Sequence, residues 1–223
     1  MAHPPEAAPI AFLSDLHGNL AALESVLAEL KRLRVTRMYV AGDLLLGGEE
    51  PLEVWQRLQT LGATCARGPS DLALGSVDPS SLLPIDETQR RRARQFAETR
   101  MTIGDLVAER LRRLPEQVRI PLVDGREVLM VHGSPADSHR EISHDMSDEE
   151  ILALMNDDPA DIIVCGSTHV PFQRTVSDYH VVNVGSVGAA PDGRVAHYTV
   201  LTPRLSSADI LQDWVSYGEP EAS

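Results

Sequence analysis

The segment IAFLSDLHGNL, residues 10–20, decides the architecture of the chain. Its apolar half predicts a buried strand, which stops at a polar turn carrying Asp15 and His17. Asn19 suits the N-cap of a helix. The helix that follows is predicted by apolar residues at helical spacing, namely Leu20, Leu23, Val26, Leu27, Leu30 and Leu33. Asp15 and His17 are therefore expected where a strand meets a helix.

The same arrangement recurs further along the chain. RMYVAGDLLLGG (37–48) predicts an apolar strand, then Gly42-Asp43, then a glycine-rich loop. A helix is expected from about Pro51, because proline is favoured at the first helical position. ATCARGPSD (63–71) predicts a third short strand that ends in a polar turn. Three strands joined by two helices form a βαβαβ unit, which implies a largely parallel sheet.

Residues 81–114 have a different character, rich in arginine and glutamate, and predict a helical, cap-like segment. Its apolar residues are spaced to line helices: Phe96, Met101, Ile103, Leu106, Val107, Leu111 and Leu114. The run RRRAR (90–94) is compatible with nucleic-acid binding. A solvated helix face, offset by nearby acidic residues, is the favoured interpretation.

The second half of the chain predicts more strands. VRIPLVDGREVLMVHGSP (118–135) contains two β-rich runs joined through Asp124-Gly125, which indicates a hairpin. SDEE at 147–150 forms a capping box ahead of a short helix. ADIIVCGSTH (160–169) predicts a buried strand that ends in a polar loop.

The last third predicts two further strands and a terminal helix. YHVVNVGSVG (179–188) and RVAHYTVL (194–201) are the strands, and the helix is expected at about 208–217. The chain shows no internal repeat and no low-complexity linker. It therefore predicts a single domain over residues 1–223, with a core at about 8–202.

Composition and charge exclude several classes of protein. Hydrophobic residues make up 43% of the 223 residues, which argues against disorder. The net charge of −13 disfavours nucleic acid and anionic membranes as partners. Cys65 and Cys165 lie in separate apolar runs and are expected to be buried, reduced thiols. Without a basic leader or a long apolar run, a cytoplasmic location is expected.

Five polar residues share one topological position: Asp15, His17, Asp43, His132 and His169. Each follows the C-terminal end of a predicted strand, and such ends line one crevice in open α/β sheets. Carboxylate and imidazole together suit Mn, Fe, Co or Zn. An Asp-x-His pair on extended backbone would aim both side chains the same way. Any one of these residues alone is more often a cap, a turn former or a core histidine, so the metal-site hypothesis depends on their recurrence.

Six short blocks, in order, resemble the calcineurin-like metallophosphoesterases. They are SDLHGN, AGD, RGPSD, VHGSP, GSTH and VNVGSVG, and the resemblance spans about residues 8–202. The chain is most similar to the compact bacterial branch of small phosphodiesterases and diadenosine-tetraphosphatase-related proteins. The resemblance implies a four-layer α/β/β/α sandwich that holds two metal ions bridged by an aspartate.

Carried over from that resemblance, the first metal would be held by Asp15, His17, Asp43 and His169. The second would share Asp43 and take His132, together with an asparagine and a histidine. This chain departs from the pattern, because Pro69 stands at the asparagine position and Ser167 at the histidine position. A further histidine of many relatives is replaced by Ser70. His139 and His144 are candidate substitutes, although exposed loop histidines are the simpler interpretation.

These departures predict one strong metal site, or a second ion that binds weakly with substrate. The resemblance then implies a metal-dependent phosphoesterase that hydrolyses a phosphodiester or phosphomonoester through a metal-activated water. His132 is a candidate catalytic base, and Arg67 a candidate phosphate-binding residue or else a partner of Asp71. The expected ligand is a phosphorylated small molecule or a nucleotide. The alternatives are a ligand sensor and a protein-interaction module that lack efficient turnover.

VNVGSVG (182–188) is expected to be structural, with Asn183 forming hydrogen bonds within its turn or orienting a metal ligand.

Overall fold

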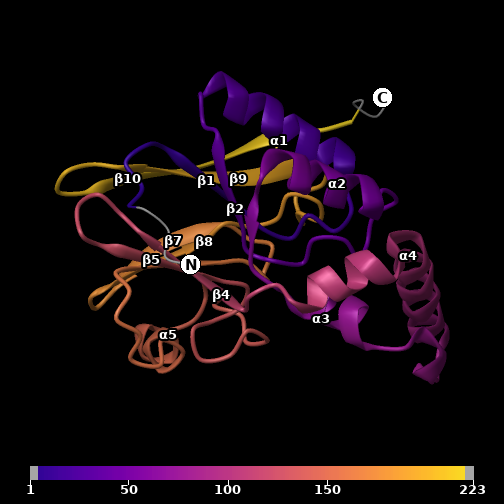
Figure 1. Cartoon of the computed structure of the whole chain (residues 1–223). Coiled ribbons are helices and arrows are strands. Elements are labelled where there is room, and N and C mark those ends of the chain that lie inside the picture. Colours follow the sequence, from indigo (N-terminus) through magenta and orange to yellow (C-terminus); the bar gives the residue numbers. More distant parts are fainter. Residues whose placement is uncertain (1–4, 219–223) are drawn as a thin grey trace.

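Two five-stranded sheets lie face to face in the computed structural model of the chain, which describes residues 5–218 (Figure 1). The strands are β1 (Ile10–Leu13), β2 (Arg37–Val40), β3 (Thr64–Cys65), β4 (Gln117–Pro121), β5 (Glu127–Val131), β6 (Ile162–Cys165), β7 (Phe172–Val176), β8 (Tyr179–Asn183), β9 (Val195–Pro203) and β10 (Ala208–Ser216). The helices are α1 (Leu20–Arg32), α2 (Pro51–Leu61), α3 (Pro69–Ser76), α4 (Glu87–Arg112) and α5 (Asp148–Ala153), with a 3₁₀ turn η1 (Pro79–Ser81).

Each sheet combines three parallel strands with two that pair antiparallel to their neighbours. The first sheet has the order β10-β9-β1-β2-β3, in which β1, β2 and β3 are parallel, as the βαβαβ pattern predicts. The second has the order β4-β5-β6-β8-β7, in which β5, β6 and β8 are parallel. The predicted hairpin through Asp124-Gly125 is the antiparallel pair β4 and β5. Polar loops follow the C-terminal ends of the parallel strands, so these ends determine where the candidate site lies.

Alternation along the strands creates the layers. In β1, Leu13 faces a cluster under α1 and α2, whereas Phe12 faces the space between the two sheets. In β5, Met130 faces that same space, and Leu129 faces a third cluster under α5. Figure 1 shows α1 and α2 on one side of the paired sheets and α5 on the other. The result is the expected α/β/β/α sandwich, because the strand period of two sends successive side chains to opposite faces.

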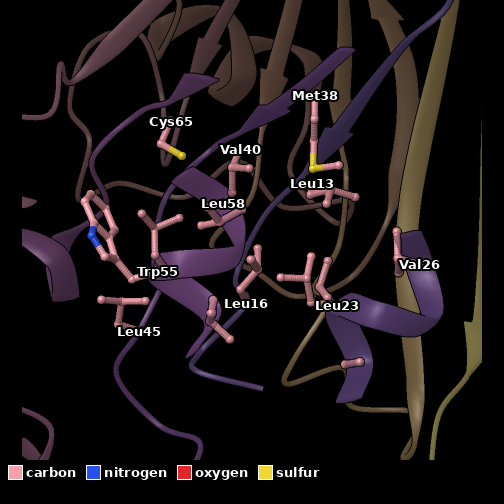
Figure 2. Close-up of a cluster of buried hydrophobic side chains, with 14 of the residues drawn as sticks. Leu13, Leu16, Leu23, Val26, Met38, Val40, Leu45, Trp55, Leu58 and Cys65 are labelled. Atoms are coloured by element: carbon pink, nitrogen blue, oxygen red, sulfur yellow. The ribbon is translucent and has the colours of Figure 1, made fainter. Parts of the chain in front are cut away.

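The outer cluster under α1 and α2 is closely packed. Figure 2 shows Leu23 and Val26 of α1 and Trp55 and Leu58 of α2 gathered over the strand residues, and all four side chains are buried. The helices begin as predicted, because the Asn19 side chain accepts a hydrogen bond from Ala22 N–H and Pro51 is the first residue of α2. This packing fixes the loops that leave β1 and β2.

Helix α4 lies within residues 81–114, where a helical segment is predicted, and it packs against α3 at one end of the molecule (Figure 1). Helix α4 buries Phe96, Ile103 and Leu111, and its backbone is interrupted at Gly104, which has a φ of 69°. Arg90 and Arg94 form exposed ion pairs with Glu87. These pairs agree with the interpretation of RRRAR as a solvated helix face.

The prediction of a helix at about 208–217 is wrong. Residues Ala208–Ser216 form β10, which pairs with β9 along its whole length. Ile210 and Gln212 point inward and are half-buried, whereas Asp209, Leu211 and Asp213 between and beside them are exposed. The strand β7 was not predicted, and it forms an antiparallel hairpin with β8.

Among the helices of residues 5–218, none combines the length and the apolar character that a membrane crossing requires.

Candidate metal centre

The loops that follow β1, β2, β5 and β6 bring the five predicted site residues together. Asp15 Oδ1 lies 3.1 Å from His169 Nε2 and 3.6 Å from His17 Nε2. The two imidazole Nε2 atoms are 3.2 Å apart. His132 Nε2 lies 4.0 Å from Asp15 Oδ1 and 3.8 Å from Asp43 Oδ2. Residues up to 154 positions apart in the chain thus converge on the Asp15 carboxylate.

Each of the three histidine rings is fixed by a hydrogen bond to a backbone carbonyl oxygen. Nδ1 of His17, His132 and His169 lies 2.7, 2.9 and 2.9 Å from the carbonyl oxygens of Leu46, Ala41 and Ala189, respectively. A carbonyl only accepts, so Nδ1 must carry the proton in each ring. In the neutral imidazole the Nε2 lone pair is then free and faces the aspartates. A backbone partner on one ring nitrogen is the usual support of a metal-binding histidine.

The backbone at the site is held in a left-handed conformation. Asp15, His17, Asp43, Ser167 and His169 have φ values of 54°, 48°, 53°, 71° and 62°. The prediction that Asp15 and His17 lie on extended backbone is therefore wrong, although their side chains do converge. Strand β1 ends at Leu13, and a turn directs both side chains instead. Non-glycine residues in this region cost free energy, and they persist where the surrounding structure holds them.

Asp15 is the electrostatic centre of the cluster. Its side chain is fully buried, and burial alone would raise its pKa, but hydrogen bonds from His169 and His17 and the nearby His132 hold that pKa well below the usual range. Burial would lower the pKa of His17, yet the Asp15 carboxylate raises it to about 9. The hydrogen bond to Asp15 likewise raises the pKa of His169. The Asp15 carboxylate thus attracts positive charge. Without a metal, protons on the neighbouring imidazoles supply this charge, and a bound metal ion would replace these protons.

A second aspartate, Asp71, supports the site although the sequence suggested it only as a partner of Arg67. Its buried carboxylate accepts hydrogen bonds from the N–H groups of Asp43, Leu44 and Gly68. Burial, together with the charge of Asp43, raises the pKa of Asp71 to about 7. The carboxylate therefore binds the loop after β2 to the first turn of α3. An aspartate at the third helical position after a glycine N-cap was the available signal.

The close approach of these two loops requires a glycine. A Cβ atom placed on Gly68 would lie 2.2 Å from Asp43 Oδ1 and 2.6 Å from Asp43 N, so a larger residue would displace the carboxylate. On the same turn, Ser70 N–H donates to Asp43 Oδ1. Asp43 is thus positioned by contacts from the segment that carries the unusual Pro69.

The two replaced positions supply backbone contacts to the site. Pro69 is the first residue of α3 and has no ligand atom. Ser167 donates its backbone N–H to Asp15 Oδ2, at 3.0 Å. The Ser70 hydroxyl is buried, and it has no hydrogen-bond partner among residues 5–218. In the part of the chain that the structure describes, the group around His132 therefore contains only Asp15 and Asp43 besides the imidazole.

The other candidate residues are not brought into this cluster. The Arg67 guanidinium donates to the Arg112 carbonyl and to the Glu116 carboxylate, rather than to Asp71. Its phosphate-binding role stays a prediction. The His144 ring packs beside Phe172, with the ring centroids 6.5 Å apart. His139 lines a separate polar hollow beside Glu116.

Asn183 fixes the loop that presents His169. It is fully buried, and its amide nitrogen donates to the Gly166 carbonyl and the Thr168 hydroxyl. Its amide oxygen accepts from Gly185 N–H. The expectation that Asn183 bonds the turn after β8 is confirmed, and the same side chain also orients the loop after β6.

The donor set fits a divalent transition metal. Bonds of about 2.0–2.2 Å place neighbouring ligand atoms roughly 3–3.5 Å apart. The separations among Asp15, His17 and His169, from 3.1 to 3.6 Å, are close to this range. Those around His132 are longer, at 3.8 and 4.0 Å. The resemblance implied that Asp43 is shared between two metals, whereas in this geometry Asp15 is common to both groups.

Comparisons with known proteins agree with this architecture. Residues 9–204 match the sequence profile of the calcineurin-like phosphoesterase superfamily domain. An uncharacterized protein of Methanocaldococcus jannaschii is 26% identical in an alignment of 219 positions that covers 91% of this chain and 86% of that protein. A hypothetical protein from Pyrococcus horikoshii matches with a TM-score of 0.82 at 21% identity, over 95% of this chain and 89% of the other. A metallophosphoesterase from Sphaerobacter thermophilus matches with a TM-score of 0.72 at 24% identity, over 96% and 90%. At these identities the solved structures support the fold alone.

Proposed function

Because the chain belongs to the calcineurin-like phosphoesterase superfamily, we propose that it hydrolyses a phosphodiester or phosphomonoester with one tightly held divalent metal. The observation that carries this proposal is the hydrogen-bonding pattern shared by three imidazoles, whose Nδ1 atoms bond to backbone carbonyls and whose Nε2 atoms face the carboxylates of Asp15 and Asp43. The proposed substrate is a phosphorylated small molecule or a nucleotide. Cytoplasm is the proposed location, since both cysteines are buried and unpaired.

The residues divide into two roles in this proposal. Asp15, His17 and His169 would hold the metal, because their ligand atoms are the most closely spaced. A divalent metal there would polarise a phosphoryl oxygen and lower the pKa of a water. Asp43 and His132 face the adjoining space. With its Nδ1–H on Ala41, a neutral His132 keeps Nε2 free to accept a proton or to bind a second, weaker ion.

The second candidate function is a ligand sensor or interaction module with this fold. Pro69 and Ser167 favour it, because neither supplies the side-chain ligand that the resemblance implies for a second metal. Loss of one preorganised electrostatic element costs about 10²–10³ in rate for enzymes in which it has been removed. Slow turnover and no turnover are therefore the two outcomes to separate.

The experiment combines metal content and turnover on one sample. The purified protein is stripped, loaded with Mn²⁺, desalted, and divided between elemental analysis and an assay with bis-p-nitrophenyl phosphate. We expect about one retained ion and slow turnover. Pro69→Asn/Ser167→His is expected to retain two ions and to raise turnover by about 10²-fold, since it restores a second charge at the site.

The controls and outcomes are distinct. Asp15→Asn should lose both the metal and the turnover, whereas His180→Asn, which changes a half-buried histidine on β8 outside the cluster, should retain both. Two ions in the natural protein would contradict the single-site proposal. A metal-loaded protein that hydrolyses neither this diester nor p-nitrophenyl phosphate would favour the sensor.

A further inference from the structure

A hollow of about 390 Å³ lies between the segment after η1 and the first turns of α4. We call it the α4 hollow. Its walls include Leu46, Leu83, Pro84 and Phe96, and its polar groups come from Gln89 and Arg92. The volume falls in the range of about 300–1,000 Å³ that is typical of small-molecule sites, which are mostly apolar with a few polar groups.

The polar groups of the α4 hollow are all available as donors. Gln89 uses its amide oxygen to accept from Ile85 N–H, which leaves its amide nitrogen free to donate. Arg92 forms no ion pair within residues 5–218, whereas its neighbours Arg90 and Arg94 both pair with Glu87. No carboxylate lines the hollow. A ligand that fits it therefore has an apolar body and presents acceptor atoms or negative charge to Arg92.

The α4 hollow adjoins the metal centre through a single loop. Leu46 is one of the residues that line the hollow, and its carbonyl oxygen accepts a hydrogen bond from Nδ1 of His17 at 2.7 Å. The next residue, Gly47, packs against the His17 side chain and accepts a hydrogen bond from Gln95 of α4. Leu46 thus borders the hollow and also contacts the imidazole of His17, so one loop connects the two sites. This shared loop is the reason to assign the hollow to the organic part of a substrate whose phosphate lies at the metal centre.

We propose that the α4 hollow binds the organic part of the phosphoester substrate, and that this part is an apolar, ring-sized group carrying an acidic substituent that pairs with Arg92. The inference rests on the proposed function for the identity of the ligand as a substrate. That the hollow binds an apolar anion is inferred separately, from its volume, its apolar lining and Arg92. A carboxylate and a second phosphate offer Arg92 the same chemistry, so both are tested as the substituent.

The first experiment compares matched chromogenic diesters on the Mn²⁺-loaded protein. They are p-nitrophenyl phenyl phosphate and its analogues with a carboxylate or a phosphate on the phenyl ring. We expect an acidic analogue to have a KM about tenfold lower than the plain ester, and the better of the two identifies the substituent. Arg92→Gln should bring the KM values of that pair together. Arg91→Gln, an adjacent exposed arginine that does not line the hollow, is the matched control and should keep the preference.

The second experiment needs no turnover. Binding of 1-anilinonaphthalene-8-sulfonate, an aromatic anion, is followed by its fluorescence on the full chain. Arg92→Gln should weaken binding about tenfold, and Ala93→Phe, which fills the hollow, should abolish it, whereas Arg91→Gln should change it less than twofold. Circular dichroism and the melting temperature verify that each variant is folded.

The outcomes separate the two proposals. If Arg92→Gln behaves like Arg91→Gln in both experiments, or if Ala93→Phe leaves dye binding intact, the α4 hollow is not the proposed site. If no ester is hydrolysed but the dye results hold, the phosphoesterase proposal fails and the hollow remains an anion-selective binding site. If turnover occurs without an acidic preference, the proposed substrate class is wrong.

Discussion

The protonation of His17 predicts an unusual pH dependence for the metal-free protein. Its pKa rises from 6.5 to about 9, and its side chain is only 18% exposed, so solvent screens the interaction little. A histidine with a raised pKa stabilises the folded state fully below pH 6.5, and this stabilisation is lost as the pH rises toward 9. At about 1.4 kcal/mol for each pKa unit, the loss is about 3 kcal/mol. His169 contributes in the same direction.

Other groups with shifted pKa values act outside this pH range. The pKa of Asp71 is raised from 3.8 to about 7. This carboxyl group therefore lowers the stability of the folded state as the pH rises above 3.8, and the decrease is nearly complete at pH 7. The pKa of Cys65 is raised from 9.0 to about 12, so its effect begins near pH 9. Burial lowers the pKa of both His180 and His197, and their effect on stability therefore lies below pH 6.5. Between pH 7 and 9, the cluster around Asp15 is the expected source of any change.

The assay is urea unfolding of the EDTA-treated protein at several pH values from 7 to 9, followed by circular dichroism. We expect the free energy of unfolding to fall by about 2 kcal/mol or more over this range, and His17→Asn to remove at least half of that slope. His180→Asn should keep the slope. With Mn²⁺ present the trend should reverse, because metal binding requires deprotonated imidazoles and strengthens as the pH rises. A flat profile for the metal-free protein would refute the assignment of a protonated His17 beside Asp15.

Three further predictions concern the supports of the site. Asp15→Asn should lower Mn²⁺-dependent turnover by at least about 10²-fold and abolish tight metal retention in equilibrium dialysis, because it removes the charge common to both ligand groups. Gly68→Ala should destabilise the protein by about 2 kcal/mol in urea unfolding, since its Cβ would overlap Asp43, whereas Gly62→Ala, where a Cβ meets no atom within 4 Å, should cost about 1 kcal/mol. Asn183→Ala should cost about 2–4 kcal/mol in the same assay and weaken Mn²⁺ affinity, because it leaves several buried hydrogen-bonding groups unpaired.

The metal centre was accessible from the sequence because topology places strand ends together. Asp15, Asp43, His132 and His169 each follow an apolar strand, and the parallel order of those strands is readable from the helices between them. The left-handed backbone of these loops was not accessible, because only a small fraction of aspartates and histidines adopt this conformation, so the residue types alone do not predict it. Loop conformation depends on hydrogen bonds from distant segments, such as the one from Ser167 N–H to Asp15.

The C-terminal segment shows where local pattern fails. Ile210, Leu211, Trp214 and Val215 are spaced as on one face of a helix, so periodicity alone favours a helix. Pairing with β9 over nine residues overrides this preference, since an edge strand satisfies its backbone through its neighbour. The strand places Leu211 and Trp214 in solvent, where they are 48% and 56% exposed. The short strand β7 was missed because alternating exposed residues in an edge hairpin give a weak signal.

The geometry also bears on whether the site is a remnant. Each of five residues at the centre has left-handed backbone, a conformation that costs on the order of 1–3 kcal/mol for a strained non-glycine residue. Three imidazoles are oriented by separate carbonyls, and Asp15 is buried with its pKa held low. An interaction module would need none of these features, because its partner would contact the exterior of the sandwich. Pro69 and Ser167 replace ligands only of the second metal that the resemblance implies, and the group of Asp15, His17 and His169 is complete. A site that stores this strain and charge is therefore better explained by cation binding than by a scaffold role.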